Sequence, residues 1–464
     1  MNLSDTIVAL STAQGTAAIA VIRISGNNSF KIIDKLFQSK TGKSIVESES
    51  NKAIFGEIIY KNKIVDEVIV TTFKNPKSYT GEDIIEISCH GSEYIQKKVI
   101  ELIINRGARM AEPGEFTLRA YLNKKMDLSQ AESVADLISS KSESSHHIAI
   151  NHLRGGISNT LGQLRQQLLE FTSLIELELD FSEEDVVFAD RKKLFELLQK
   201  IKLTIESLLT SFSTGNAIKN GIPVSIVGIP NVGKSSLLNA LFKDKKAIVS
   251  NIEGTTRDSI EDTLNIGGIL YRFIDTAGLR ETKDEIESIG IEITKEKISS
   301  SKILIYMVDI STQSSDEVVK AVKELSNDNI SIFLVINKID ISNKDNLNIY
   351  LENLKNKNVS DFVFHTECIS TFNNDDIEKL KSHFSGKYHW NSSNTLISNQ
   401  RHWAALQLAL ESINAVINGL DSGISSDLLT IDIKQCLHEI GTITGEVTTD
   451  DILGNIFSNF CIGK

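Results

Sequence analysis

The sequence of 464 residues contains few cysteines and few prolines, four of each. Its cysteines form no CxxC pair, which argues against a disulfide framework or a zinc site and fits a reducing, cytoplasmic compartment. Long hydrophobic runs are also missing, because the longest, Ala17–Ile22 and Ile303–Val308, are far too short to span a bilayer. We therefore expect no membrane association. The four cysteines are Cys89, Cys368, Cys436 and Cys461.

An excess of positive charge is absent as well. The formal net charge is −12 and the calculated pI is about 5.4, so any nucleic-acid partner must be held by a local basic patch. The first residues, Met1–Asp5, lack the basic segment of a signal peptide. A hydrophobic fraction of 41% and a charged fraction of 24% are typical of a globular protein, and this length predicts roughly three domains.

Residues 1–120 have the pattern of a mixed α/β domain. An apolar run at Ala17–Ile24 predicts a buried strand. The runs Ile54–Tyr60 and Ile64–Thr72, joined by three polar residues, predict a hairpin, and Asp83–Ser88 predicts another strand. Apolar residues at helical spacing then predict an amphipathic helix over Ser92–Arg106.

Residues 121–215 and 387–464 are helical in pattern. In the first segment a series of apolar residues recurs in steps of three and four, which predicts the buried face of a bundle helix. The acidic stretch Glu176–Asp185 is interpreted as a solvated helix end or loop, with a metal site as the alternative. Helices before and after one domain predict a single bundle into which that domain is inserted. The apolar series is Ile157, Leu161, Leu164, Leu168, Phe171 and Ile175.

Residues 216–386 alternate apolar strands with helical segments, which predicts a mainly parallel sheet covered on both faces. Strands are expected at Val224–Val227, Leu270–Ile274, Ile303–Asp309 and Ile332–Ile336. The sequence Thr263–Phe273, with two central glycines, predicts a hairpin and hence one antiparallel edge strand.

The stretch Gly228–Ser235 lies between the strand Val224–Val227 and a predicted helix over Leu237–Leu241. This is the context that a phosphate-binding P-loop requires, since its glycines turn backbone N–H groups toward an anion at a helix N-terminus. We expect Lys234 to neutralise the β- and γ-phosphates and Ser235 to ligate Mg²⁺.

Further motifs follow in the order of a GTPase. Asp275–Gly278 ends a strand and faces Mg²⁺ and the γ-phosphate, while Gly254–Asp258 is a switch loop whose Thr256 ligates Mg²⁺. Asn337–Asp340 ends another strand, and its last carboxylate accepts the two hydrogens that distinguish guanine from adenine. The expected GTP contacts are Asn231, Val232, Gly233, Lys234, Ser235, Ser236, Ser250, Thr255, Thr256, Asp275, Thr276, Ala277, Gly278, Asn337, Lys338, Asp340 and Ser370.

One residue type is missing from this set. Small GTPases place a glutamine directly after the Asp-x-x-Gly motif to orient the attacking water, whereas this chain has Leu279. Catalysis therefore needs another water-positioning group and another source of positive charge. Arg257 and Arg280 lie near the motifs, but we interpret them as partners in local salt bridges.

At this point the chain resembles the MnmE/TrmE family of tRNA-modification GTPases over essentially its full length. The resemblance implies an N-terminal α+β folate-binding domain over 1–120, a discontinuous helical bundle over 121–215 and 387–464, and a Ras-like P-loop G domain over 216–386. The stretches that carry it, besides the GTPase motifs, are Asp5–Ala9, Arg23–Gly26, Tyr79–Asp83, Pro113–Thr117, Asp127–Glu132 and the terminal Phe460–Lys464.

The resemblance also implies partners and a reaction. Family members are homodimers that join a flavoprotein, MnmG, in a heterotetramer and act on carbon 5 of the wobble uridine of certain tRNAs. The product carries an aminomethyl or carboxymethylaminomethyl group, and the one-carbon donor is 5-formyl- or methylene-tetrahydrofolate. Hydrolysis is stimulated by K⁺ and requires that two G domains pair.

Residue roles carry over by position. The resemblance implies a K⁺ ion held by Asn231, Ser250, Ile252 and Thr255, where an arginine finger otherwise acts. It implies that Glu287 is the catalytic glutamate and that Lys234 is the second catalytic residue. Without it, Asn231 would be a loop brace and Glu287 an acidic residue near a helix start. The implied folate contacts are Arg23, Glu86, Lys125 and Lys464.

Alternatives remain open for several of these assignments. Glu86 ends an apolar strand and could instead be a buried ion-pair partner, and Cys461 is either a reactive thiol near folate or a small buried hydrophobe. Two rival functions are a switch GTPase of ribosome assembly without its own modification chemistry, and a one-carbon transferase with a merely regulatory GTPase.

Overall fold

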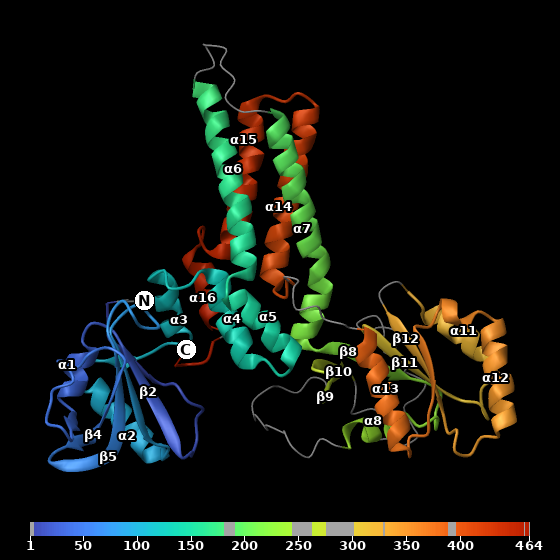
Figure 1. Cartoon of the computed structure of the whole chain (residues 1–464), viewed down its shortest axis with the longest axis horizontal. Coiled ribbons are helices and arrows are strands. Elements are labelled where there is room, and N and C mark those ends of the chain that lie inside the picture. Colours follow the sequence, from blue (N-terminus) through green and yellow to red (C-terminus); the bar gives the residue numbers. More distant parts are fainter. Residues whose placement is uncertain are drawn as a thin grey trace. The chain divides into compact units, whose positions relative to one another are not determined.

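The computed structural model describes residues 4–180, 191–243, 262–274, 301–327, 330–387, 396–458 and 460–463 (Figure 1). The chain forms two compact units. The first comprises Met1–Ile138, Ala149–Glu206 and Ala404–Lys464, and the second Ser139–Ile148 and Ser207–Trp403. Among the described helices, none combines the length and the apolar character needed to cross a membrane.

The N-terminal part of the first unit is a seven-stranded sheet in the order β3-β4-β5-β6-β2-β1-β7. All neighbours are antiparallel except β1 and β7, which are parallel. The expected mixed α/β pattern is therefore present. The strands are β1 (Ile7–Leu10), β2 (Ile19–Ser25), β3 (Phe37–Ser39), β4 (Lys52–Tyr60), β5 (Lys63–Phe73), β6 (Ile84–His90) and β7 (Arg109–Met110).

The hairpin between β4 and β5 is tighter than predicted. Lys63 pairs with Tyr60 and belongs to β5, so only Lys61 and Asn62 form the turn. Both turn residues have positive φ, 50° and 60°. A two-residue loop with this backbone conformation matches the twist of the two strands, and asparagine tolerates it better than most residues.

Two helices, α1 (Ser29–Asp34) and α2 (Glu93–Ile104), cover one face of this sheet, seen in blue in Figure 1. Strand residues alternate between faces. On β2, Ile22 is buried against the helices and Arg23 lies on the opposite face, which also carries the half-exposed Phe55 and Ile69. The predicted strand at residue 17 begins two residues later, at Ile19, which is exposed rather than buried.

A polar cluster joins the loops at one end of the sheet. Arg119, which is 2% exposed, bonds Glu115 at 2.8 Å, Glu82 at 3.1 Å and the carbonyl oxygen of Asp5 at 2.8 Å. Arg109 bonds both oxygens of Glu115, with Nη2 2.6 Å from the Oε1 that Arg119 also contacts and Nη1 2.8 Å from Oε2. Since these acids belong to stretches that carried the family resemblance, part of that signal maintains the fold of this domain.

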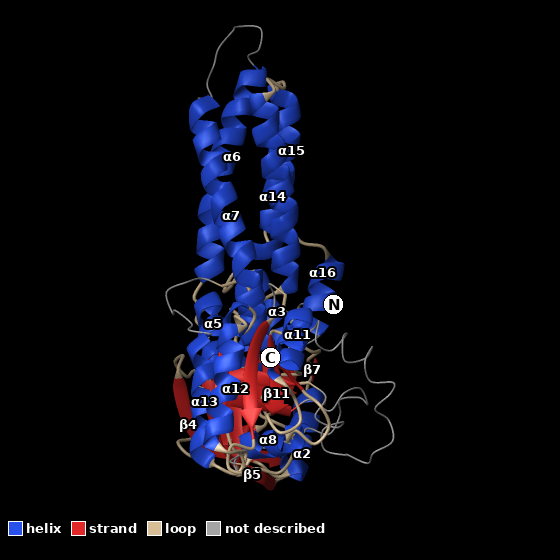
Figure 2. Cartoon of the chain, turned by 90° about the vertical axis from the view of Figure 1, so that its right-hand side faces the viewer, coloured by secondary structure: helices blue, strands red, loops and turns tan. Residues whose placement is uncertain are grey.

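Four long helices run side by side in both views (Figures 1 and 2). They are α6 (Gly156–Asp180), α7 (Arg191–Asn220), α14 (Gln400–Asp421) and α15 (Ser426–Thr444). Lys434 of α15 forms an ion pair with Glu176 of α6 at 2.7 Å. Shorter helices complete the first unit and its connections: α3 (Glu115–Leu122), α4 (Leu128–Ser139), α5 (Glu143–Leu153) and α16 (Asp450–Ser458).

The core of α6 follows the predicted series with one exception. Leu161, Leu164 and Leu168 are at most 4% exposed. Phe171 is half-buried, and Thr172 takes the core position instead, with its hydroxyl donating to the carbonyl oxygen of Leu168 at 2.8 Å. That local bond satisfies the threonine hydroxyl, so a polar residue can be buried there.

The second unit contains a six-stranded sheet in the order β13-β12-β11-β8-β10-β9. Only β9 is antiparallel to its neighbour, as the two central glycines predicted. The strands are β8 (Ile222–Val227), β9 (Asp262–Ile266), β10 (Ile269–Phe273), β11 (Ile303–Asp309), β12 (Ser331–Asn337) and β13 (His365–Cys368).

Helices cover both faces of this sheet (Figure 1). One core contains residues of α8 (Lys234–Phe242) and α13 (Asn374–Lys387). The other contains residues of α11 (Ser315–Leu325), α12 (Lys344–Asn356) and the short 3₁₀ helix η2 (Val359–Asp361). This double covering explains why the central strands are continuously apolar.

We expect Arg119→Met to destabilise the N-terminal domain by about 3 to 5 kcal/mol, because it leaves a buried carboxylate with fewer partners. Burial alone would raise the pKa of Glu115, but hydrogen bonds from Arg109, the Glu112 backbone and Arg119 hold that pKa below its ordinary value. The stabilisation is therefore present at neutral pH and is lost as the pH falls through the acid range.

Calorimetric unfolding of the full chain at neutral and acid pH measures both effects. The variant should unfold at a lower temperature than the wild type at neutral pH, with a smaller difference in acid. Arg154→Met, at an exposed arginine, is the matched control and should leave the transition in place. Equal loss in the two variants would contradict the role of Arg119.

Candidate functional site

The loop from β8 to α8 has the backbone of an anion cradle. Gly228 has a φ of +156° and Gly233 a φ of +103°. A side chain at Gly228 would lie 2.6 Å from the carbonyl oxygen of Met307, and one at Gly233 would lie 2.3 Å from the amide nitrogen of Asn337. Both positions therefore require glycine for conformation and for space. Asn231, also at positive φ (61°), is exposed at the tip of the loop.

Lys234 is the first residue of α8, and its ammonium group folds over the loop. It donates to the carbonyl oxygens of Gly228 at 2.6 Å and Ile229 at 3.2 Å. These contacts hold one positive charge beside the N-terminus of a helix, where the backbone dipole is also positive. Ser235, in the first turn, is half-buried. The lysine ammonium and the backbone N–H groups can thus bind a nucleotide phosphate, and the serine hydroxyl can ligate its Mg²⁺.

Asn337 joins this loop to a second predicted motif. Its side chain is 1% exposed, and Nδ2 donates to the carbonyl oxygen of Val232 at 2.8 Å. Its Oδ1 accepts from the backbone N–H of Thr371 at 3.3 Å. One buried amide therefore connects the P-loop, the end of β12 and the loop that follows β13.

The neighbouring residues of that motif differ in exposure. Lys338 forms an ion pair with Asp309 at 2.8 Å, at the end of β11. Burial would raise the pKa of Asp309, but the bonds from Lys338 and Ser311 lower it below the ordinary value. Asp340 is exposed, so its carboxylate can reach a ligand from solvent. In the predicted motif, Asn337 and Lys338 thus brace the surrounding loops, whereas Asp340 is accessible to a ligand.

Ser370 is held inside the loop after β13. It is 4% exposed, its N–H donates to Asp376 at 2.9 Å, and its hydroxyl accepts from the N–H of Phe372 at 3.3 Å. These bonds fix the backbone of the loop that was predicted to close over guanine. Val232 is buried, whereas Ser236 is exposed on α8.

Much of the predicted catalytic set lies outside the described residues. This applies to the switch loop, the Asp-x-x-Gly motif, most of the K⁺ ligands, the catalytic glutamate and the terminal lysine. The residues concerned are Ser250, Ile252, Thr255, Thr256, Asp275, Thr276, Ala277, Gly278, Glu287 and Lys464.

The predicted folate residues include an ion pair. Arg23 and Glu86 are register partners on β2 and β6, and Nε and Nη2 of Arg23 lie 2.8 and 2.7 Å from Oε1 of Glu86. The guanidinium also lies over the rings of Tyr79, at 5.3 Å, and Phe116, at 5.7 Å. Glu86 thus forms the ion pair left open as an alternative, but it is only partly buried, with 26% side-chain exposure, and Arg23 contacts one of its carboxylate oxygens.

Lys125 and the tail contact the same domain. The ammonium of Lys125 donates to the carbonyl oxygen of Pro76 at 3.0 Å, in the loop that carries Tyr79. The N–H of Gly114 donates to the carbonyl oxygen of Cys461 at 3.4 Å, and Phe460 is 9% exposed. Cys461 itself is exposed, so it is not a buried hydrophobe.

Some structural partners were missed from sequence. Asp309 pairs with Lys338 but was not predicted as a site residue. It lies at the end of β11, and the carboxyl ends of parallel strands are where functional polar residues are common. Arg119 was not singled out, since it stands two residues after a recognised motif in an ordinary amphipathic helix. The position of Asp309 at a strand end could have identified it, whereas no local sequence signal identifies Arg119.

Two protein-family models match this chain. Residues 6–125 match the model of the GTP-binding protein TrmE N-terminus, and residues 128–461 match that of the MnmE helical domain. The chain belongs to the MnmE family. It is therefore a GTPase of the tRNA-modification type, with the multidomain α/β and helical architecture described above.

Full-length relatives carry the same family name. The chain is 51% identical to the tRNA modification GTPase MnmE of Flavobacterium johnsoniae, over 99% of each chain. It is 49% identical to that of Christiangramia forsetii, over 100% of each chain. Among solved structures, Era in complex with MgGDPNP and a 16S ribosomal RNA fragment is 26% identical, over 41% of this chain and 66% of that one. The TM-score is 0.29, which is too low to support a statement about this chain.

We expect Asn337→Ala to weaken GTP binding by roughly 10- to 100-fold, because it leaves the buried Val232 carbonyl oxygen and the partly buried Thr371 N–H without their partner. A fluorescent-nucleotide titration measures the loss. Asn343→Ala is the matched control, since Asn343 is exposed and only caps α12 by accepting from Asp345 N–H.

Hydrogen exchange separates bracing from direct contact. In nucleotide-free protein the Asn337 variant should exchange the amide hydrogens of residues 228–236, apart from Pro230, faster than the wild type, which loss of a ligand contact alone would not cause. Unchanged exchange and unchanged affinity would contradict the bracing role.

Proposed function

We propose that this protein uses GTP hydrolysis to drive the modification of carbon 5 of the wobble uridine in certain tRNAs, together with the flavoprotein MnmG. The observation that supports this most is likeness over both the N-terminal and the helical domain to proteins named tRNA modification GTPase MnmE. A chain related only through its G domain would lack that support.

GTP would bind along the carboxyl ends of the strands β8 and β12. Lys234 would meet the β- and γ-phosphates, Ser235 and Thr256 would ligate Mg²⁺, and Asp340 would select guanine. The contacts of Lys234 with loop carbonyls support this, because they hold the cation at the cradle. Bound Mg²⁺ supplies charge neutralisation at the phosphates.

A K⁺ ion would take the place of an arginine finger. Asn231, Ser250, Ile252 and Thr255 would offer it neutral oxygens, and Glu287 would orient the attacking water. The exposed Asn231 at the loop tip supports this assignment, as does Leu279, whose side chain cannot orient water. Bound K⁺ supplies positive charge where negative charge develops in the transition state.

A one-carbon tetrahydrofolate would bind to the N-terminal domain. Arg23, Glu86 and Lys125 would contact it with Lys464, and the folate would supply the methylene carbon. The Glu86 side chain keeps 26% exposure, and its second carboxylate oxygen, which Arg23 does not contact, fits a donor-rich pterin edge. The basic residues suit the glutamate tail. FAD and NADH chemistry would belong to the partner.

The assembly would be a homodimer through the N-terminal domain, joined to MnmG in a heterotetramer in the cytoplasm. Half-exposed Phe55 and Ile69, which are register partners on neighbouring strands, support an interface on the sheet face away from the helices. Apolar side chains on one open sheet face are typical of association surfaces. The tRNA would bind at a local basic patch.

We expect GTP hydrolysis to be faster in K⁺ than in Na⁺, on the order of 100-fold, since one well-placed charge has about that effect on a phosphoryl-transfer rate. Asn231→Ala should remove the difference between the salts. Asn239→Ala, at an exposed asparagine of α8, is the control and should keep it. Equal wild-type rates in the two salts would refute the cation site.

The function itself is tested by expressing the protein in a strain that lacks its own copy of this gene and by analysing the nucleosides at the wobble position of its tRNAs. The wild type and the control Lys243→Ala should restore the modified uridine, whereas Lys234→Ala should not. Arg23→Ala should fold and hydrolyse GTP but fail to bind 5-formyl-tetrahydrofolate and to restore the modification. Modification by Lys234→Ala would favour a merely regulatory GTPase, and no restoration by the wild type would refute the proposal.

A further inference from the structure

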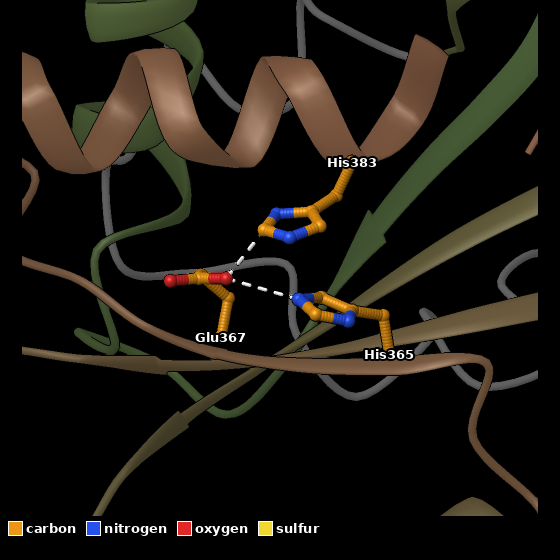
Figure 3. Close-up of side chains that lie close together, drawn as sticks. All are labelled: His365, Glu367 and His383. Atoms are coloured by element: carbon orange, nitrogen blue, oxygen red, sulfur yellow. Dashed lines mark hydrogen bonds and ion pairs between the residues drawn. The ribbon is translucent and has the colours of Figure 1, made fainter. Parts of the chain in front are cut away.

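Two histidines and a glutamate meet on the second unit, between a strand and the helix that packs over it. His365 and Glu367 belong to the edge strand β13, and His383 to α13, which packs over it (Figure 3). Because strand residues two apart share a face, His365 and Glu367 both point toward that helix. Cys368, on the other face, packs against the opposite core.

The three side chains share one oxygen. Nε2 of His365 lies 2.9 Å from Oε2 of Glu367, and Nδ1 of His383 lies 3.3 Å from the same oxygen. The two imidazoles are stacked, with centroids 3.9 Å apart and an angle of 24° between their planes. Each residue offers one metal-ligating atom, and all three atoms lie within 4.8 Å of one another.

Burial gives a second, independent indication. Nδ1 of His383 has almost no exposed area, and no group among the described residues hydrogen-bonds to it with acceptable geometry. A buried ring nitrogen without a bond is costly, because its hydration is lost and not replaced. It faces a carboxylate at ion-pair distance, so an electrophile between them would satisfy both atoms.

The geometry points to a transition-metal site, and we propose that His365, Glu367 and His383 bind one Zn²⁺ ion. Zinc is held by imidazole nitrogens and carboxylate oxygens at about 2.0 to 2.2 Å in a tetrahedron, which sets ligand atoms about 3.3 Å apart. The separation from Oε2 of Glu367 is 3.3 Å for His383 and 2.9 Å for His365, so His365 would move outward slightly as the ion enters. Imidazole ligands also favour zinc over Mg²⁺ or Ca²⁺.

Access and position fit an ion that has three protein ligands and one solvent ligand. The side chains keep 29%, 18% and 39% exposure for His365, Glu367 and His383, so solvent can deliver the metal and supply a fourth ligand. Among the described residues no other group of three histidine, cysteine or acidic ligands meets this way. The ion would fasten α13 to a four-residue strand whose only strand neighbour among the described residues is β12.

Titration of the metal-free full chain with ZnCl₂ tests the proposal, followed by calorimetry and by the visible spectrum of the Co²⁺ form. We expect one tight site per chain, a tetrahedral Co²⁺ spectrum and a higher unfolding temperature with Zn²⁺. His383→Ala and Glu367→Gln should each weaken binding on the order of 100-fold and remove the Co²⁺ spectrum.

His438→Ala, at an exposed histidine of α15, is the matched control and should bind Zn²⁺ like the wild type. Circular dichroism checks that each variant is folded, and Glu367→Gln is the conservative variant should His383→Ala unfold. The proposal is overturned if the wild type binds no tighter than the His383 variant, or if His438→Ala loses as much affinity.

Discussion

The buried amide of Asn337 is the interaction on which the nucleotide site depends. It donates to the P-loop at Val232 and accepts from Thr371, so three loops from separate strands share one side chain. Such a buried group is stabilising only while both bonds are made, because either orphaned partner is costly. The residue therefore couples the shape of the phosphate cradle to the loops that would surround the base.

The N-terminal domain depends on a comparable device. Arg119 is almost fully buried and meets two acids and a backbone carbonyl, while Arg109 bonds both carboxylate oxygens of Glu115. The loops joined in this way lie beside Arg23 with its aromatic neighbours Tyr79 and Phe116. In both domains, therefore, some of the motif residues that identify the family are buried polar groups. Their hydrogen bonds and ion pairs offset the desolvation penalty of burying them.

Local pattern predicted most elements and some of the site. The order of the GTPase motifs predicted a P-loop domain inserted between helical segments, and glycine pairs and apolar periodicity predicted the edge hairpin and the bundle helices. Where prediction was wrong, a local bond or a pairing outweighed the pattern. Thr172 entered the core in place of Phe171 because its hydroxyl bonds Leu168, and the hairpin lost a loop residue because Lys63 pairs with Tyr60.

What the sequence by itself determined is the chemistry available along the chain: glycines that permit positive φ, a lysine at a helix start, and motifs in a recognisable order. What only the tertiary structure decided is which distant residues meet. Val232 and Asn337 are 105 positions apart, Arg23 and Glu86 are 63 apart, and His383 reaches β13 from a helix. The physical reason is that side-chain partners across a sheet or between layers depend on strand order and register, which local pattern does not encode.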